Sequence, residues 1–274
     1  MWVVSTSSMP GRLGRVVVVV ALALAWTSLF WFVPPQRAFP VVDAAADAVS
    51  DAVRAATGLR APWLWVAKST LLAGGVVVVV ALWQGRHRTG LALPAGPGLG
   101  LFAVAVVVAL PFQIALGLDD AVARYYRSFF GPRGHEWIVA NAVVMLVEHA
   151  FIEGVVLSLA LSGGLPPVDE RPRRGLRGLP WLGALGLGPL VDPTRAGPRT
   201  LLAVPIDAWP ALIGQGFVFG CIHFTKAPSE LVTAFPGGVA VGWLTVRTGS
   251  IWPAALLHLV TGAVVFTTLR ATRP

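Results

Sequence analysis

Long apolar runs separated by short polar stretches dominate this chain of 274 residues. A helix needs roughly 20 such residues to cross a hydrocarbon core about 30 Å thick. We predict helices for all of the long runs, because lipid offers no partner for the backbone groups of an open sheet. The predicted spans are residues 16–33, 63–83, 98–118, 136–161, 200–223, 231–247 and 250–269.

A further apolar segment, residues 178–191, is short and rich in Gly and Pro, which predicts a broken crossing helix or an interfacial segment. The charge pattern favours a crossing, because Lys and Arg accumulate in cytoplasmic loops. If spans alternate and this segment crosses, the basic groups on one side are Arg12 with Arg15, 85–88, 171–177, and Arg270 with Arg273. We therefore expect an all-α transmembrane helix bundle of about eight spans, seven of them clear, with both termini cytoplasmic.

Three shorter features complete the predicted layout. The first apolar run is long and lacks a small-residue cleavage pattern after it, so we interpret it as a retained span and not a signal peptide. Residues 41–56 place Asp43, Asp47 and Asp51 four apart, which predicts an amphipathic helix with a solvated acidic face. Residues 119–137 mix aromatics with Arg and resemble an interfacial anchor.

Composition agrees with a membrane protein, since 55% of the residues are hydrophobic and only 12% are charged. A net charge of +8 would suggest nucleic acid in a soluble protein. Here the Arg residues lie in short loops and no basic face carries stacking aromatics, so we exclude a nucleic-acid partner. The single cysteine, Cys221, excludes an internal disulfide framework. We expect residues 1–274 to form one integral membrane domain.

Ionisable side chains inside the predicted spans are the candidates for chemistry, because burying them in lipid is costly without a function or a partner. Three histidines, His149, His223 and His258, fall within or at the ends of three different spans. Glu148 and Glu153 lie in the same span as His149. We expect these spans to line a common polar cavity.

Helical spacing places Glu148 on a different face of its helix from His149 and Glu153. His149 and Glu153 are one turn apart and can meet side by side. Glu148 is rotated away from that pair and shares a stripe with Asn141, two turns earlier. Glu148 is therefore left to face another partner, although a purely structural polar network between helices is an alternative.

The three histidine-bearing stretches resemble the motifs of the CPBP family of intramembrane endopeptidases, which includes the CAAX prenyl endopeptidases and bacteriocin-processing proteins. That family carries EExxxR, FxxxH and HxxxN on separate spans of an eight-helix bundle. Glu148 matches the first Glu, Phe219 and His223 match FxxxH, and His258 matches the last motif. The resemblance covers roughly residues 136–269, which carry the core motifs.

The chain departs from the family pattern at three positions. His149 stands for the second Glu, Glu153 for the Arg, and Gly262 for the final Asn. The first two changes together exchange a Glu-to-Arg pair for a His-to-Glu pair, and a contact between neighbouring turns can survive that exchange. Gly262 offers no side-chain donor, and Thr261 is the nearest substitute.

The resemblance implies hydrolysis of a peptide bond within the membrane by an activated water. Glu148 would be the general base, His223 would hold and polarise the water, and His258 would donate to the oxyanion. No metal is required, although one Glu and two His, namely Glu148, His223 and His258, would also suit zinc. The expected substrate is a lipidated or membrane-anchored protein cut near the membrane surface, for example at its C-terminal tail. The EHxxxE variant is also compatible with a myxosortase-like branch that processes C-terminal sorting signals.

Two other functions remain alternatives. The chain could be a catalytically inactive CPBP-like membrane scaffold or chaperone, because it lacks the Arg and Asn of the family pattern. A transporter is disfavoured by the absence of a visible internal repeat. No organelle signal is evident, and a bacterial inner membrane is the expected location.

Overall fold

The computed structural model describes residues 9–32, 40–58, 66–67, 69–94, 98–130, 134–161, 165, 200–202, 204–224 and 226–272. The described part is almost entirely helical, which confirms the predicted all-α class. Its α-helices are α1 (Met9–Phe32), α3 (Pro40–Thr57), α5 (Gly75–Gln84), α6 (Gly98–Leu118), α7 (Asp120–Phe130), α8 (Gly134–Phe151), α9 (Ser158–Ala160), α11 (Trp209–Cys221), α12 (Pro228–Thr248) and α13 (Trp252–Thr272). Wider π-helical turns form η1 (Thr70–Gly74) and η3 (Ile152–Leu157), and η4 (Ile206–Ala208) is a 3-10 turn.

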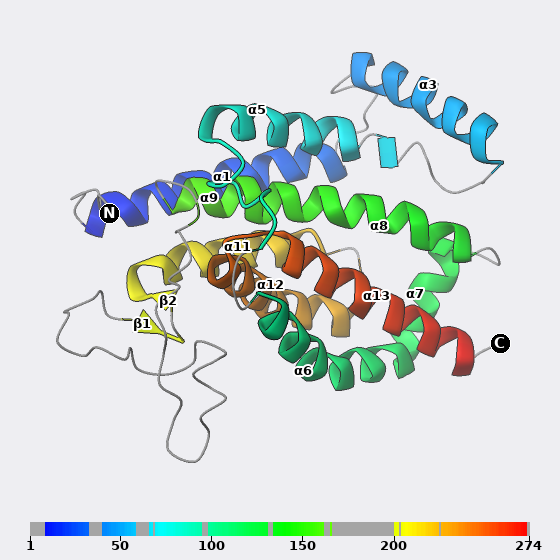
Figure 1. Ribbon diagram of the computed structural model, residues 1–274. Helices are drawn as coiled ribbons and strands as arrows, with labels where there is room; N and C mark the ends of the chain where they lie inside the picture. Colours follow the sequence, from blue (N-terminus) through cyan, green and yellow to red (C-terminus); the bar gives the residue numbers. More distant parts are fainter. Residues whose placement is uncertain are drawn as a thin grey trace.

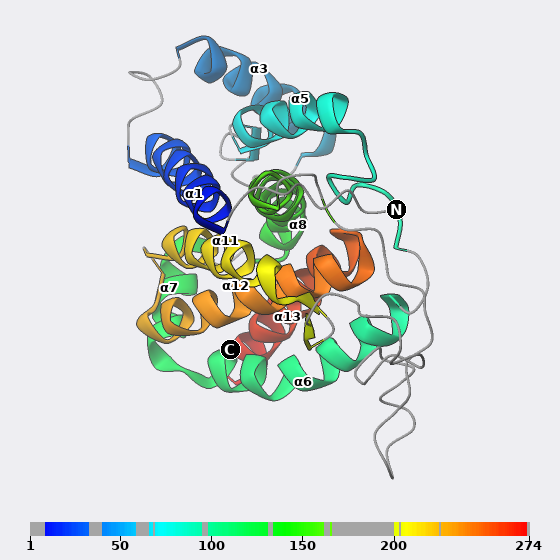
Figure 2. The same cartoon turned by 90° about the vertical axis from the view of Figure 1, so that its left-hand side faces the viewer.

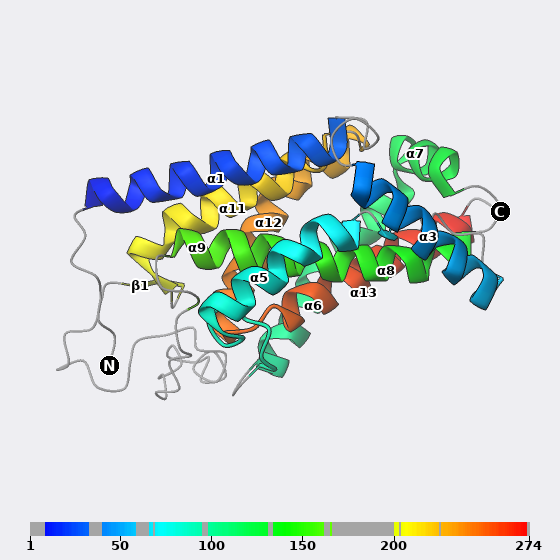
Figure 3. The same ribbon diagram turned by 90° about the horizontal axis from the view of Figure 1, so that it is seen from above.

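Helix α8 lies at the centre of the bundle (Figures 1 and 2). Seen end-on in Figure 2, α1, α5, α11 and α13 lie around it, and α6 lies farther out beyond α13. Helix α8 contacts α13, α5 and η1, while α1 runs alongside α11 (Figure 3). Helix α8, which carries Glu148 and His149, is therefore surrounded by segments from both halves of the chain.

Three described helical segments are long and apolar enough to cross a membrane: Gly100–Leu118, Asn141–Ala160 and Trp252–Thr272. Shorter apolar helices cover Leu13–Ser28 and Thr70–Gln84. These segments overlap predicted spans, and the chain is an integral membrane protein. The predicted segment 178–191 lies outside the described residues, so the count of eight spans stays a prediction.

The predicted span at residues 200–223 is wrong in its first half. Residues Thr200–Leu201 (β1) and Val204–Pro205 (β2) pair as a small antiparallel hairpin, and η4 follows. Helix α11 begins only at Trp209, where Pro210 occupies the first turn without losing an intrahelical hydrogen bond. At about 1.5 Å per residue its 13 residues fall well short of the membrane thickness. The apolar pattern could not show this, because a short apolar strand and an apolar helix have similar compositions.

Helices α11 and α12 approach each other closely through glycines. A Cβ atom built on Gly238 would lie 2.7 Å from Cβ of Phe219 and 2.9 Å from Cα of Gly216. A Cβ on Gly242 would overlap Oε1 of Gln215. Small residues at such contacts let helix backbones pack tightly where lipid provides no hydrophobic driving force. This contact holds the FxxxH stretch of α11 against α12.

Large apolar side chains remain exposed on the outer helices. Leu82 and Trp83 of α5 are 83% and 74% exposed, and Val107 of α6 is 70% exposed. A soluble monomer rarely exposes so many apolar groups side by side. Lipid covering these faces accounts for them, as expected for a bundle whose ionisable groups point inward.

The two amphipathic segments differ in what they contact. Helix α3 presents Asp47 and Asp51 to solvent, which confirms the predicted solvated acidic face at these two positions, while the side chain of Asp43 lies outside the described part. Helix α7 is capped by Asp119, whose Oδ1 accepts from the backbone N–H of Ala121 at 2.6 Å. Hydrogen bonds from Ser229 and from the first turn of α7 hold the pKa of Asp119 below its ordinary value. Helix α7 is thereby fixed against α12 and places Tyr126 in the bundle.

Candidate active site

A cavity of about 190 Å³ lies among α6, α7, α11, α12 and α13. His223 and His258 both line it, whereas Glu148, His149 and Glu153, which were expected to share a polar cavity with them, are not among its lining residues. His223 follows the end of α11, and His258 lies in the second turn of α13. The rest of the wall is mainly apolar, with Met145, Phe219 and Leu257 among its members. The side chains of His223 and His258 thus reach the same cavity from different parts of the chain.

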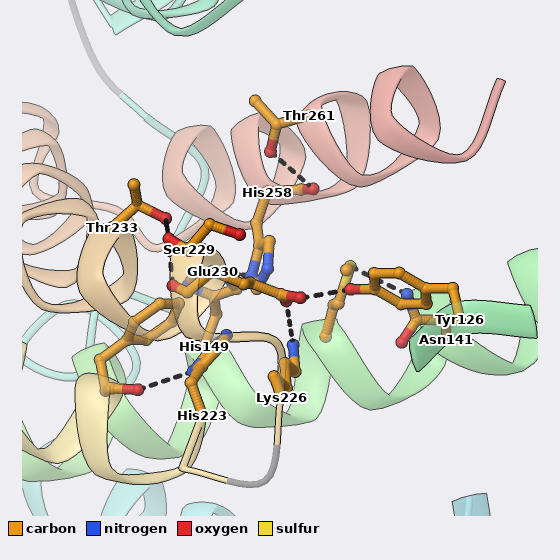
Figure 4. Close-up of polar contacts among 12 residues, drawn as sticks. Tyr126, Asn141, His149, His223, Lys226, Ser229, Glu230, Thr233, His258 and Thr261 are labelled. Atoms are coloured by element: carbon orange, nitrogen blue, oxygen red, sulfur yellow. Dashed lines mark hydrogen bonds and ion pairs between the residues drawn. The ribbon is translucent and has the colours of Figure 1, made fainter. Parts of the chain in front are cut away.

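A chain of hydrogen bonds runs from His258 into the protein interior, and Figure 4 labels its first two members, His258 and His149. Nδ1 of His258 and Nε2 of His149 lie 2.8 Å apart. Nδ1 of His149 lies 2.8 Å from Oε2 of Glu153, and both side chains are fully buried. A carboxylate only accepts, so Nδ1 of His149 carries the proton of this contact.

Gln215 of α11 completes the chain from the far side. Its Nε2 donates to Oε1 of Glu153 at 2.9 Å, so both carboxylate oxygens of Glu153 have donors. The pairing of His149 with Glu153 that the spacing predicted is therefore present. The structure adds two links that the sequence analysis missed: Gln215 on one side and His258 on the other.

The continuation of α8 as a π-helical turn positions Glu153. The α-helix ends at Phe151, and η3 carries Ile152 to Leu157 in a wider coil. Every residue of η3 is buried. Such a widened turn changes the direction in which its side chains point and often accompanies functional sites. Here it aims Glu153 at both His149 and Gln215.

His223 has a fixed hydrogen-bonding state. Its Nδ1 lies 2.8 Å from the carbonyl oxygen of Phe219. A carbonyl accepts only, so Nδ1 carries the proton and Nε2 of a neutral ring is an acceptor. The one-turn spacing of FxxxH thus has a structural meaning: the carbonyl of Phe219 sets the tautomer of His223.

Phe219 packs against all three imidazoles. Its ring centroid is 4.8 Å from that of His223, 5.5 Å from that of His258 and 6.0 Å from that of His149. The rings of His223 and His258 are themselves 6.5 Å apart. Phe219 therefore packs beside the two cavity histidines and contacts both rings, but it does not lie between them.

Glu148 lies apart from the two cavity histidines. It lines a separate small pocket whose wall includes Trp26, Ser69, Phe151 and Ile222. Its Oε1 is buried without a hydrogen-bond partner in the part of the chain that the structure describes. The sequence placed Glu148 on a different face from His149, and the structure agrees with that division. It does not bring Glu148 into the cavity of His223 and His258.

The remaining predicted residues contribute little polar chemistry to the cavity. Thr261 lines it, but its hydroxyl donates to the carbonyl oxygen of His258 at 3.0 Å. Gly262 also lines it, and a Cβ there would lie 3.1 Å from Cε of Met145. Asn141 donates from Nδ2 to Sδ of Met145 at 3.8 Å, and Met145 in turn lines the cavity.

A second polar cluster lines the same cavity, and the sequence analysis missed it (Figure 4). Nζ of Lys226 lies 2.8 Å from Oε1 of Glu230, and the hydroxyl of Tyr126 donates to the same oxygen at 2.9 Å. Burial by itself would lower the pKa of Lys226, but Tyr126 and Glu230 outweigh it and raise that pKa above its ordinary value. Lys226 is therefore a cation. The spacing of Lys226 and Glu230, one turn apart and close after His223, was the available signal.

The donor set does not fit a zinc ion. Among the described residues, no three His, Cys, Asp or Glu side chains converge as a metal would require. Glu148 lies in the other pocket, so only His223 and His258 of the three candidate ligands share the cavity. The trio Glu148, His223 and His258 that would have served as zinc ligands is thus divided between two spaces.

Comparison with known families agrees with the motif resemblance. Residues 135–264 match the family model described as type II CAAX prenyl endopeptidase Rce1-like. No curated protein and no solved structure matches the chain. The matched segment includes α8, η3, α11 and α12, most of α13, and all three histidines of the site. This motif-bearing segment of the integral membrane protein therefore belongs to the Rce1-like, CPBP-type family of intramembrane endopeptidases.

Proposed function

We propose that this protein hydrolyses a peptide bond of a membrane-associated protein, using a water molecule activated between His223 and Glu148. The observation that carries the proposal is the arrangement of His223 and His258 in one cavity, with their inner nitrogens already engaged. Each ring therefore presents Nε2 for chemistry. Family membership of residues 135–264 supports the reaction class.

His223 is the proposed water ligand. Because its Nδ1 proton is bound by the carbonyl of Phe219, Nε2 can accept a hydrogen bond from the attacking water. Glu148 is the proposed general base, because its Oε1 lacks a partner whereas both oxygens of Glu153 are engaged. This role requires the Glu148 side chain to turn from its own pocket towards His223. The water oxygen attacks the carbonyl carbon, and its proton passes to Glu148 and then to the leaving amine.

His258 is the proposed donor to the oxyanion. It can donate from Nε2 only if its Nδ1 accepts the proton shared with His149. That arrangement requires His149 to carry protons on both nitrogens, which the carboxylate of Glu153 compensates at 2.8 Å. Glu153, through His149, would thus select the tautomer of His258. The inverted pair would replace the Asn donor that Gly262 cannot supply.

The mainly apolar wall of the cavity supports an apolar or lipid-modified substrate segment. Trimming the C-terminal tail of a lipidated protein is the activity that the family description suggests for such a site. We propose two alternative substrates for this peptide-bond hydrolysis: the C-terminal tail of a lipidated protein, or a C-terminal sorting signal. A bacterial inner membrane and a cytoplasmic location of both termini remain our proposals for its setting.

The test uses the purified full chain in liposomes with a peptide that ends in a farnesylated Cys and three further residues. Mass spectrometry would detect the released tripeptide. We expect Glu148→Gln to lower kcat by about 10²- to 10⁴-fold, the range for a lost general base. We expect His258→Ala to lower it by about 10²- to 10³-fold, as for a lost oxyanion donor. Asp51→Asn, on the exposed face of α3, is the matched carboxylate-to-amide control.

A non-catalytic scaffold is the second candidate, and one observation favours it: Glu148 and the cavity histidines lie in separate pockets. The same experiment separates the two. Full cleavage by Glu148→Gln would show that Glu148 is not the base. No cleavage by the wild type of the farnesylated peptide, or of any protein in a membrane proteome compared with and without the chain, would favour the scaffold.

A further inference from the structure

The Lys226–Glu230 pair has unused hydrogen-bonding capacity beside the cavity. Both side chains line it, and they are 23% and 15% accessible. An ammonium group has three protons, and in the described part of the chain Glu230 is the hydrogen-bonding partner of Nζ. Oε2 of Glu230 is buried without a partner among the described residues. A buried acceptor without a donor is costly, so a ligand that supplies one would be bound favourably.

Oε1 of Glu230 has two hydrogen-bond donors. Lys226 lies 2.8 Å from it, and the hydroxyl of Tyr126 donates to it at 2.9 Å. These contacts fix the carboxylate, which leaves Oε2 as a preoriented acceptor. The Lys226 ammonium beside it is a preoriented donor. The pair therefore offers one donor and one acceptor next to each other, with the two charges compensated.

A neutral donor–acceptor pair fits this site better than an anion does. A carboxylate could bind Lys226, but it would also meet the unpaired oxygen of Glu230 and repel it. In an extended chain, the N–H and the C=O of one residue point to the same side, as they do in an antiparallel sheet. Those two groups complement the pair: the C=O can accept a hydrogen bond from Lys226, and the N–H can donate one to Glu230.

We propose that Lys226 and Glu230 form a substrate subsite that binds the N–H and C=O of one residue of an extended peptide. The backbone N–H of Lys226 bonds the carbonyl of His223 at 2.9 Å, so this subsite lies beside the proposed water ligand. Binding there would align the substrate backbone past His223 and His258 without reading its side chains. The inference rests on the proposed peptidase function, because it names how the same cavity holds its substrate.

The decisive variant is Glu230→Gln. Lys226 and Tyr126 both donate to the position of Oε1, so they would hold the amide oxygen there and direct the amide NH₂ to the position of Oε2. The acceptor for the substrate N–H becomes a donor, while size and shape are kept. Asp51→Asn, which changes a carboxylate in the exposed pair with Arg54, is again the matched control.

The experiment scans the farnesylated peptide with N-methyl groups, one backbone amide at a time, in wild type and Glu230→Gln. Binding is measured by photo-cross-linking of versions whose scissile amide is reduced to an amine, and KM and kcat are measured with cleavable versions. In the wild type we expect N-methylation at one position to weaken binding about tenfold, the equivalent of about 1.4 kcal/mol. Glu230→Gln should weaken binding of the unmodified peptide to a similar degree, leave kcat within about twofold and abolish the N-methyl effect.

Three results would overturn the subsite. The first is an N-methyl penalty that is as large in Glu230→Gln as in the wild type at every position, and the second is a lack of cross-linking of any peptide to the wild type. The third concerns the C-terminal carboxylate of the probe. If amidation of that carboxylate weakens binding to the wild type but not to Lys226→Met, Lys226 is a carboxylate site instead. Cross-linking does not need cleavage, so a wild type that binds the peptides without cutting them would contradict the proposed function and still decide the subsite.

Discussion

At the scale of single residues, the two departures from EExxxR form one connected unit. A His–Glu pair that only stabilised its own helix would make no hydrogen bonds to side chains of other helices. Here His149 also reaches His258 at 2.8 Å, and Glu153 also accepts from Gln215 at 2.9 Å. Because His149 replaces the family's second Glu, the EHxxxE stretch of α8 and η3 contacts His258 of α13 directly. The pair acts on the cavity through His258 and does not line it.

The tautomer of His258 should respond to Glu153. In Glu153→Gln the carboxylate that compensates a doubly protonated His149 is lost, so His149 should become neutral. We expect ¹⁵N NMR of histidine-labelled protein to show His258 changing from the Nε2–H to the Nδ1–H form, with kcat falling at least about tenfold. Gln215→Ala, which leaves the carboxylate in place, is the milder companion if Glu153→Gln unfolds. An unchanged His258 spectrum in a folded Glu153→Gln protein would show that Glu153 does not set the tautomer of His258 and that the His149–Glu153 pair is only structural.

At the scale of helices, the contact between α11 and α12 decides where the FxxxH motif lies. Gly216, Gly238 and Gly242 remove side chains at the points where these helices meet. Phe219 and Gln215 fill the space that the glycines leave. Because Phe219 packs against the histidine rings and Gln215 holds Glu153, the packing of this pair of helices also sets the geometry of the site.

Adjacent glycines of α12 should therefore differ sharply on substitution. Gly238→Ala forces a methyl group to 2.7 Å from Cβ of Phe219, and we expect a loss of about 1–3 kcal/mol, as for other overpacked interiors. Gly237→Ala meets nothing within 4 Å and should be neutral or stabilising by up to about 1 kcal/mol, because Ala favours helix. Thermal unfolding in detergent would measure both. Equal stability of the two variants would contradict the close approach.

At the scale of the whole molecule, the bundle places a mainly apolar outer surface around an inner line of polar residues. The outer faces of α5 and α6 carry strongly exposed apolar side chains. Glu153, His149 and Gln215 are fully buried at the centre. Such a distribution suits a protein that carries water chemistry inside a membrane, because lipid contacts only apolar groups while the ionisable groups satisfy one another.

The predicted orientation places α3 and the turn at residues 85–88 on opposite sides of the membrane. Asp47 and His87 are both exposed, so each can be replaced by Cys in a Cys221→Ser background. In proteoliposomes of uniform orientation, an impermeant maleimide added outside should label only one of the two variants, and detergent should make both reactive. Labelling of both before detergent would mean that α5 does not cross, and the prediction of eight spans would then be wrong.

The sequence by itself was sufficient for the class of protein, most helix positions, the His149–Glu153 contact and the family. Each of these depends on local periodicity, which 3.6 residues per turn and the membrane thickness impose. The sequence failed at residues 200–208, where an apolar strand resembles an apolar helix, and it gave no sign of the π-helical turn that carries Glu153.

Only the tertiary structure decided which polar groups meet. His149 and His258 are 109 residues apart, and Gln215 and Glu153 are 62 apart, so no spacing rule could pair them. The separation of Glu148 from the cavity histidines and the Tyr126–Glu230–Lys226 cluster likewise depend on how α7, α8 and α12 pack. Packing between distant helices sets these contacts, whereas local periodicity only determines which face of each helix is available.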